Sequence, residues 1–323
     1  MISWPAPGTR VTVRYRRPAG SIPPLTDAVG HLLAIDPVVR LRTKTGKVVE
    51  IQTADVVALR ALTATPVRNA HIRALEHAAA LAWPGIEQQS VDGWLLRAGH
   101  GITLRANSAV PLDVSADYRT IPAIVDWYRH RGLTPRLAIA DRLLGLPGAG
   151  ERPNRMLVRD VSAGKPHPSV TLAARPDDTW LRLYHRAIPV DVLTAVLDGE
   201  VVFGVCAGIA VGRAAVTEAP DGTRWVGLSS VTVAAAPGGS EHLTRLCEAL
   251  LAWGADRGAT RGYVRVADEN TTANGLVDSL GFTLHHRGRY YPVASYADSH
   301  ARGNVTAGHL ECELDSHPPG AGP

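Results

Sequence analysis

The pattern in residues 225–291 constrains the fold of this 323-residue chain more than any other feature. Short apolar runs, typical of strands, alternate there with segments whose apolar side chains recur at the 3.6-residue spacing of a helix. The order is predicted to be strand, long helix, strand, short helix and strand, over residues 225–233, 243–257, 262–266, 271–280 and 282–291. A strand that leads through a glycine-containing loop into a helix offers backbone N–H groups to an anion. The segment therefore predicts a ligand-binding unit of mixed α and β structure.

The loop before the long helix reads Pro237-Gly238-Gly239-Ser240-Glu241. Glycines let the backbone approach a ligand closely, although two glycines before a helix are also an ordinary turn. The spacing matches neither the Rossmann fingerprint nor the P-loop, which argues against a dinucleotide or a nucleoside triphosphate. The loop alone therefore leaves open whether an anion binds there.

Three segments of the C-terminal half resemble the GNAT acetyltransferase superfamily. They are the strand at residues 225–233, the end of the long helix at residues 252–259, and the run from Val266 through Asn270 to Leu280-Gly281-Phe282. Residues 93–97 and 105–108 resemble the N-terminal half of a group of actinobacterial members. With its small N-terminal β module, the whole chain resembles the two-domain mycobacterial GNAT proteins described as histone-acetyltransferase-like.

The resemblance implies an α+β protein: a GNAT fold, with a mixed central sheet flanked by helices, preceded by a small SH3-like β-barrel. It implies an N-acetyltransferase that moves acetyl from acetyl-CoA to a primary amine, a small molecule or a protein lysine, by direct attack in a ternary complex. Acetyl-CoA would lie between two splayed strands, with its pyrophosphate at the N-terminus of the long helix. The residues that the resemblance assigns to acetyl-CoA are Val231, Val233, Gly238, Gly239, Ser240, Glu241, His242, Leu243, Asn270 and Ala273. The catalytic candidates are Ser229, Ser230 and Asn270.

Two positions depart from the pattern of the superfamily. The cation that the pyrophosphate loop usually carries is missing, and Glu241 lies where the phosphates are expected. Two like charges ~4 Å apart would cost about 4 kcal/mol at an effective dielectric constant near 20. Val277 occupies the position of a tyrosine that protonates the thiolate in many members, and Tyr290 and Tyr291 are candidates to replace it. These departures keep a second function open: a non-catalytic or acyl-CoA-sensing GNAT-like module whose basic N-terminal domain binds a protein or nucleic-acid partner.

The catalytic candidates also have structural interpretations. Because strand side chains alternate, either Ser229 or Ser230 is predicted to face the cleft, unless both are ordinary sheet residues. Asn270 is also placed to cap the helix that follows it. By the same alternation, His285 and His286 are predicted to face opposite ways and so not to serve one site.

Four further polar residues keep two interpretations each. Glu218, beside an Asp-Gly turn, is either a remote base or a solvated carboxylate. Arg97, Arg105 and Asn107 either line the acceptor side of the site or make stabilising polar contacts.

The N-terminal module carries the excess positive charge. The chain has a formal net charge of +4, and residues 1–65 hold nine basic and four acidic residues, which leaves residues 66–323 at −1. Short alternating runs, with a hairpin tip at residues 45–47, predict the strands of a small barrel over residues 9–15, 29–35, 38–43 and 48–53. The charge indicates either an anionic partner, such as nucleic acid or an acidic protein surface, or simply an arginine-rich solvent face.

The middle of the chain is predicted to be a mixed α/β layer. Helices are expected over residues 69–82 and 121–131, and a loop over residues 143–154. Strands are expected over residues 91–98, 102–108, 137–140, 156–161, 169–173, 180–184, 201–206 and 209–216.

The remaining features predict a cytoplasmic protein with no membrane segment and no metal site. No apolar run approaches the ~18 residues of a membrane span, and residues 1–17 lack the organisation of a signal peptide. The cysteines, Cys206, Cys247 and Cys312, are far apart, and the 13 histidines show no metal-ligand spacing. The predicted domains are residues 1–66 for the barrel, 67–190 and 191–300 for the two GNAT halves, and 301–323 for a flexible tail.

Overall fold

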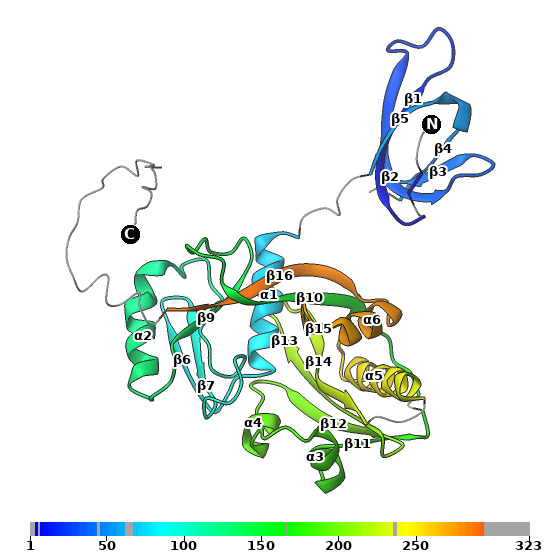
Figure 1. Cartoon of the computed structure of the whole chain (residues 1–323). Helices are drawn as coiled ribbons and strands as arrows, with labels where there is room; N and C mark the ends of the chain where they lie inside the picture. The colour runs from blue at the N-terminus through cyan, green and yellow to red at the C-terminus, as the bar shows by residue number, and fades with distance from the viewer. Residues whose placement is uncertain are drawn as a thin grey trace, which may run out of the picture. The chain divides into compact units, whose positions relative to one another are not determined.

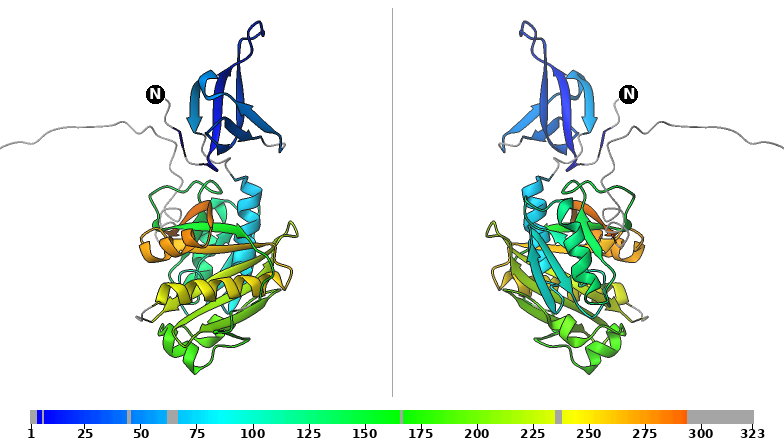
Figure 2. Two further views of the ribbon diagram at one scale, coloured as in Figure 1. Left: turned by 90° about the vertical axis from the view of Figure 1, so that its right-hand side faces the viewer. Right: turned by 90° about the vertical axis from the view of Figure 1, so that its left-hand side faces the viewer.

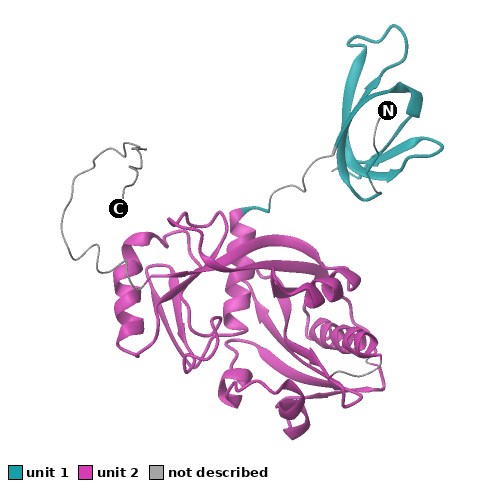
Figure 3. Ribbon diagram, in the orientation of Figure 1, with its two compact units in different colours: residues 1–68 teal, residues 69–323 magenta. Residues whose placement is uncertain are grey.

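The chain forms two compact units, residues 1–68 and residues 69–323, in a computed structural model that describes residues 4–5, 7–43, 46–61, 67–165, 167–234 and 238–293. Figure 3 shows the two units, and each is described by itself. The predicted tail at residues 301–323, Cys312, and part of the hairpin tip at residues 45–47 lie outside the described residues.

The first unit is an antiparallel sheet of five strands in the order β4-β3-β2-β1-β5. Its strands are β1 Arg10–Arg16, β2 Leu25–Ala34, β3 Val39–Arg42, β4 Val48–Ile51 and β5 Val56–Ala61. The alternation noted in the sequence is real: Val11 and Val13 are fully buried and pack with Leu32 and Leu41. The chain returns through the short 3₁₀ turn Thr53–Asp55, so that β5 pairs with β1. The charged side chains lie on the outside of this small core.

The second unit is built on an eight-stranded mixed sheet in the order β11-β12-β13-β14-β15-β10-β16-β9 (Figure 1). Its strands are β9 Arg136–Ala140, β10 Glu151–Asp160, β11 Val170–Ala173, β12 Glu200–Cys206, β13 Ala210–Glu218, β14 Arg224–Val233, β15 Arg261–Ala267 and β16 Thr283–Pro292. β14 and β15 run parallel, and the pairs on either side of them are antiparallel. A smaller sheet contains β6 Glu87–Val91, β7 Trp94–Ala98 and β8 Val110–Pro111.

Two helices cover opposite faces of the large sheet (Figure 2). The helix α1, Asn69–Leu81, packs with Trp225, whereas α5, Gly239–Ala255, packs with the next residue of the strand, Val226. Consecutive strand residues point to opposite faces, so the two helices lie on different sides. α5 sits very close to the sheet: a Cβ on its Gly254 would come within 2.4 Å of the Val226 side chain. The face with α1 is the one that forms the candidate site.

The shorter helices complete the unit. They are α2 Ile121–Arg129, α3 Asp178–Tyr184, α4 Val190–Thr194, α6 Thr271–Ser279 and the 3₁₀ turn Tyr118–Thr120. α2 packs against the small sheet, and α3 and α4 pack with Trp83 and Phe203. No helix in the described ranges is long and apolar enough to cross a membrane.

Three local predictions were wrong. Residues 102–108 form a loop instead of a strand, because the Asn107 side chain accepts hydrogen bonds from Gly99 N and Gly101 N at 2.8 and 2.9 Å and curls the backbone around itself. Residues 180–184 belong to the helix α3, whose cap is Asp177: its carboxylate accepts from Trp180 N at 2.7 Å. The predicted loop at residues 143–154 ends early, because β10 already begins at Glu151.

Candidate active site

The parallel strands β14 and β15 pair along only part of their length. Their register runs from Trp225 with Arg261 to Leu228 with Val264. β14 continues to Val233 and β15 to Ala267, but the described residues show no pairing between the two strands beyond Val264. The backbone of residues 229–233 therefore has an unpaired edge toward β15, and unpaired N–H and C=O groups need partners.

A β-bulge at Ser230 marks the point where the strands part. Ser230 has a left-handed backbone with φ of 52°, and the pairing with β13 shifts there, from Arg213 opposite Ser229 to Val211 opposite Thr232. The extra residue changes which way the side chains face. Ser229 faces the α1 side of the sheet, whereas Val231 and Val233 pack with the α5 core. Simple alternation, used to choose between the two serines, does not hold through this bulge.

The described residues resume at Gly238, at the N-terminus of α5. Gly238 is the N-cap with φ of 74°, and its carbonyl accepts from Glu241 N and His242 N at 3.0 and 3.2 Å. The Glu241 side chain is exposed and forms an ion pair with Arg245, one turn further along the helix. Glu241 is thus neutralised at the surface by a cation of its own helix.

The other residues assigned to this turn have structural contacts as well. The Leu243 side chain is buried in the α5 core. The His242 ring lies with Nδ1 3.6 Å from the Sγ of the buried Cys206. The side chains of these two residues therefore anchor the turn, and its backbone N–H groups are what it can offer to an anion.

Asn270 caps α6. Its side-chain oxygen accepts from Ala273 N at 3.0 Å, as expected for an N-cap. The prediction that Asn270 caps the helix is therefore confirmed. The cap uses the oxygen of the amide, and contact between Asn270 and a cofactor stays a prediction.

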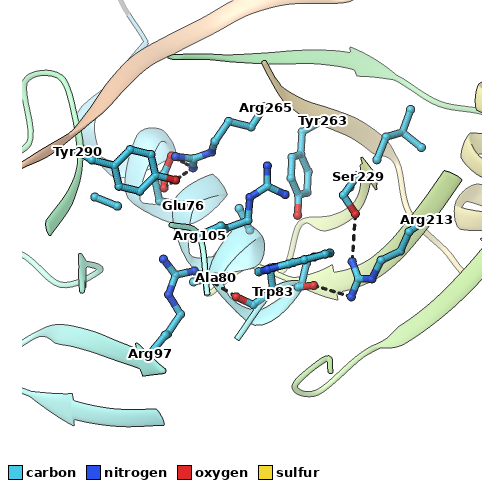
Figure 4. Close-up of a pocket in the computed structure, with 15 residues that line it drawn as sticks. Glu76, Ala80, Trp83, Arg97, Arg105, Arg213, Ser229, Tyr263, Arg265 and Tyr290 are labelled. Atoms are coloured by element: carbon cyan, nitrogen blue, oxygen red, sulfur yellow. Dashed lines mark hydrogen bonds and ion pairs between the residues drawn. The ribbon is translucent and has the colours of Figure 1, made fainter. Parts of the chain in front are cut away.

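A pocket opens on the α1 face of the sheet, directly beside Ser229 (Figure 4). We call it the arginine pocket. Its lining is Glu76, Ala79, Ala80, Ala82, Trp83, Arg97, Arg105, Ala138, Arg213, Gly227, Leu228, Ser229, Tyr263, Arg265 and Tyr290. The cavity holds about 20 Å³, which is room for a small polar group. These residues come from α1, the small sheet, two loops and five strands of the large sheet, β9, β13, β14, β15 and β16.

Two of the pocket's arginines use main-chain carbonyls instead of carboxylates. Arg213, almost fully buried, donates to the carbonyls of Leu193, Ala82 and Ala195 at 2.7–2.9 Å and to Ser229 Oγ at 3.2 Å. Burial lowers its pKa to about 9. Arg97 donates to the carbonyl oxygen and the hydroxyl of Ser108 and to the Trp83 carbonyl, and burial lowers its pKa too. Both positive charges are fixed in place without an acidic partner.

A chain of charged and polar groups leads from the pocket into β16. The Glu76 carboxylate accepts from Arg265 Nη2 at 2.6 and 2.7 Å and lies 2.7 Å from His286 Nε2. Burial alone would raise the pKa of Glu76, but Arg265 and His286 hold it well below its usual range. His286 Nδ1 lies 2.7 Å from His285 Nδ1, and burial, followed by the effect of His286, lowers the pKa of His285 to about 4.

The prediction that His285 and His286 face opposite ways was wrong. β16 carries a bulge: Met156 of β10 pairs with His286, and Leu157 pairs with Leu284, so His285 is an extra residue. The bulge turns both rings toward each other, and they form one hydrogen-bonded pair.

Arg105 differs from the other arginines of the pocket. Its guanidinium carbon lies 5.6 Å from the centre of the Trp83 ring, and Figure 4 shows the side chain beside Tyr263. It makes no hydrogen bond or ion pair with any residue that the structure describes. Burial, with a further contribution from Arg265, lowers its pKa.

Some of the remaining predicted residues line the pocket, and others have structural contacts elsewhere. Arg97 and Arg105 line the pocket, whereas Asn107 holds the loop at residues 99–103. Tyr290 lines the pocket, and Tyr291 packs with the α2 core. Val277 is buried in the α5 core, and Glu218 pairs with Arg224 at the exposed end of a hairpin. The described residues bring no group of three or more metal-ligating side chains together.

Five of the residues that define the pocket were not predicted from the sequence. They are Glu76, Trp83, Arg213, Tyr263 and Arg265. A signal did exist for Arg213, which is the one charged residue in the apolar run of residues 209–216. An arginine within an apolar strand is placed where the strand is buried. A buried arginine is rare and requires hydrogen-bond partners, so it marks a polar site.

Comparisons with known proteins identify the family. Residues 69–291 match the family described as "Probable histone acetyltransferase Rv0428c C-terminal", and residues 5–60 match the "Rv0428c N-terminal Sm-like domain". The module predicted as SH3-like is therefore described as Sm-like, which is also a small β domain.

Individual relatives extend these matches. The probable histone acetyltransferase Rv0428c of Mycobacterium tuberculosis is 64% identical over 298 residues, which cover 91% of this chain and 98% of that protein. The uncharacterized N-acetyltransferase YobR of Bacillus subtilis is 23% identical over 244 residues, 66% of this chain and 94% of that protein. A GCN5-related N-acetyltransferase structure from Kribbella flavida aligns with a TM-score of 0.44 and 16% identity, over 73% of this chain and 99% of that one. Given the family match over residues 69–291 and the 64% identity to Rv0428c, the chain belongs to the Rv0428c family and is an acetyltransferase.

Proposed function

We propose that this protein transfers the acetyl group of acetyl-CoA to a primary amine, with acetyl-CoA between β14 and β15 and the amine in the arginine pocket. One observation carries the proposal: the two parallel strands part at Leu228, immediately beside the pocket. The unpaired edge of residues 229–233 and the pocket that contains Ser229 are therefore continuous. A co-substrate on that edge and an amine in the pocket would meet at the bulge.

Three features of the described residues fit acetyl-CoA. The edge of residues 229–233 offers main-chain N–H and C=O groups that an extended amide-containing chain can pair with, as an added strand does. The first turn of α5 offers N–H groups and the positive end of the helix dipole to a pyrophosphate. The Asn270 amide nitrogen, which the cap does not use, is the further donor that we assign to the co-substrate. Acetyl-CoA supplies the thioester carbonyl that the amine attacks.

The pocket handles the proton of the amine electrostatically. Glu76 is unsuited as a general base, because Arg265 and His286 hold its pKa well below the working pH. Tyr263 is unsuited as well, because burial raises its pKa to about 12. Four guanidinium groups around one carboxylate instead lower the pKa of a bound amine, since like charges disfavour its protonated form. The neutral amine is the nucleophile, and its proton leaves to water.

Two hydroxyl groups and the bulge complete the site. Tyr263 and Tyr290 carry hydroxyl groups that can donate hydrogen bonds to a developing thiolate. Arg213 holds Ser229 in position through the bond from Nη1 to Oγ. We assign Ser229 to orienting the amine, and the backbone of Ser230 to shaping the opening between the strands.

Release of free thiol from acetyl-CoA tests the proposal. The full chain is incubated with acetyl-CoA and a panel of primary amines, and both the thiol and the acetylated amine are measured. We expect both products in equal amounts with at least one amine. Absence of transfer to every amine, together with no heat of acetyl-CoA binding in calorimetry, would sink the proposal.

The N-terminal unit is proposed to recruit an anionic partner. Among its described residues, Arg14 and Arg40 are paired with Asp27 and Glu50, whereas Arg10, Arg16 and Arg17 lie at the two ends of β1 with no acidic partner. Binding to an anionic partner should weaken with added salt, as counterion release requires. Association that is absent or insensitive to salt would refute this role.

A further inference from the structure

The charges of the arginine pocket do not balance. Its described lining has four arginines, Arg97, Arg105, Arg213 and Arg265, and one acidic residue, Glu76. Glu76 already has a cationic partner, because Arg265 contacts both of its oxygens and His286 Nε2 lies beside one of them. Arg97 and Arg213 direct their donors to carbonyl and hydroxyl oxygens, which satisfies the N–H groups but leaves the positive charges uncompensated. The pocket therefore has a surplus of positive charge in surroundings poor in water.

Arg105 is the group through which this surplus can be neutralised. Its guanidinium reaches into the pocket beside Trp83 and makes no hydrogen bond or ion pair with the described part of the chain. A guanidinium carries five N–H donors in a planar fork that matches a carboxylate or a phosphate. Leaving such a group half-buried without a partner is costly, so its environment favours a bound anion.

We propose that the acceptor of this acetyltransferase is a small primary amine that also carries an anionic oxygen group, a carboxylate or a phosphate, and that Arg105 binds this group. The inference rests on the proposed function and names the substrate class of the same site. The cavity of about 20 Å³ is roughly the size of one water molecule, so a compact group fits beside Arg105. An acceptor with additional positive charge would be repelled by the surplus of the pocket.

Matched pairs of amines test the inference on the full chain. β-Alanine is compared with its carboxamide, and O-phosphoethanolamine with ethanolamine, at saturating acetyl-CoA. A short lysine-containing peptide with basic neighbours is the third arm. Each kcat/KM is divided by the fraction of amine that is unprotonated, because the charged groups change the pKa of the amine itself.

The anionic member of at least one pair should be used about tenfold or more better than its neutral partner, and the basic peptide should be the poorest acceptor. A preference confined to one pair identifies the carboxylate or the phosphate as the group that is recognised. Equal use of both members in both pairs, or preference for the basic peptide, would overturn the inference while leaving acetyl transfer intact.

A variant assigns the preference to Arg105. Arg105→Gln should lower kcat/KM for the anionic amine about tenfold more than it lowers kcat/KM for the neutral partner. The control is Arg175→Gln, an exposed arginine outside the pocket, which should behave as the wild type. An unchanged preference in Arg105→Gln would refute the role of this residue. If that variant does not fold, Arg105→Lys, which keeps the charge but loses the fork, must show a weakened preference.

The two proposals can fail separately. If the wild type acetylates no amine at all, the proposed function fails, and calorimetry with the anionic amines still tests the site. Binding of an anionic amine that depends on Arg105 would support the anion site. Failure of both anionic amines to bind would remove it.

Discussion

The ring of Tyr263 occupies the space that a side chain on Gly227 would need. The two residues are paired across β14 and β15, and a Cβ on Gly227 would come within 2.2 Å of the ring Cζ and 2.3 Å of the hydroxyl. Tyr263 is nearly fully buried, so its ring cannot swing aside into solvent. This contact places the Tyr263 hydroxyl at the floor of the arginine pocket.

Gly227→Ala should therefore displace Tyr263 and reduce both stability and acetyl transfer. Overpacking of this kind costs about 1–3 kcal/mol. In a Tyr263→Ala background the added methyl group has room, so the second substitution should cost at least about 1 kcal/mol less than it does alone. Chemical denaturation of the four proteins measures this cycle. Additive effects would show that Gly227 and Tyr263 do not compete for this space.

The bulge at Ser230 should matter through its backbone rather than through its hydroxyl. Ser230→Gly removes the hydroxyl but adopts φ of 52° without strain, whereas Ser230→Thr keeps the hydroxyl and strains the backbone. A left-handed conformation costs a non-glycine residue about 1–3 kcal/mol. We expect kcat/KM within about threefold of wild type for Ser230→Gly and about tenfold lower for Ser230→Thr. The reverse order would make the hydroxyl group catalytic.

Removal of the charge of Glu76 should destabilise the second unit strongly. Glu76→Gln leaves Arg265 buried without a charged partner, which costs about 3 kcal/mol or more. The control is Glu218→Gln, because the exposed Glu218–Arg224 pair should contribute about 0–1 kcal/mol. Six of the seven tryptophans lie in this unit, so tryptophan fluorescence during denaturation reports on it. Similar losses for both variants would contradict the structure of this buried pair.

His285 should make the second unit less stable as the pH falls from 6.5 to about 4. Its folded-state pKa is depressed to about 4 by burial, then by His286, Arg261 and His71, while the ordinary value is 6.5. Between these pH values His285 is protonated in the unfolded chain and neutral in the folded protein, so the free energy of unfolding decreases as the pH is lowered. Glu76 adds to the decline only near the lower end of this window, because its ordinary pKa of 4.5 lies there and its folded-state pKa lies well below it.

His285→Asn should flatten this part of the stability profile. The melting temperature is measured between pH 4 and pH 7 for the wild type and the variant. An equally steep decline in both proteins would show that His285 is not the group responsible.

The sequence predicts the strands and helices around the site better than it predicts which side chains line the pocket. The order of strand and helix over residues 225–291 is visible in apolar spacing, and it positions both the parted strands and the N-terminus of α5. The arginine pocket is built from residues 76–290, separated by long stretches of chain, and no local pattern joins Glu76 to Arg265. The two bulges, at Ser230 and His285, were also invisible, because each depends on register with a neighbouring strand. Side-chain alternation therefore gave the wrong orientation for His285 and His286.

A groove beside α5 is the main alternative binding location for acetyl-CoA. It holds about 410 Å³ between α5 and the segment after β10, and Arg159, Lys165, His167 and Arg245 are among its lining residues. An anionic ligand could bind there without touching β14. The two locations differ in which backbone amides they would cover.

Hydrogen–deuterium exchange of the full chain, with and without acetyl-CoA, distinguishes these locations most directly. Residues 229–233 have an unpaired edge and should exchange readily in the free protein. Acetyl-CoA between β14 and β15 should slow exchange at residues 229–233 and at the first turn of α5, and leave residues 161–165 unchanged. Slowed exchange confined to residues 161–165 and the middle of α5, or no change at all, would contradict the proposed binding of acetyl-CoA.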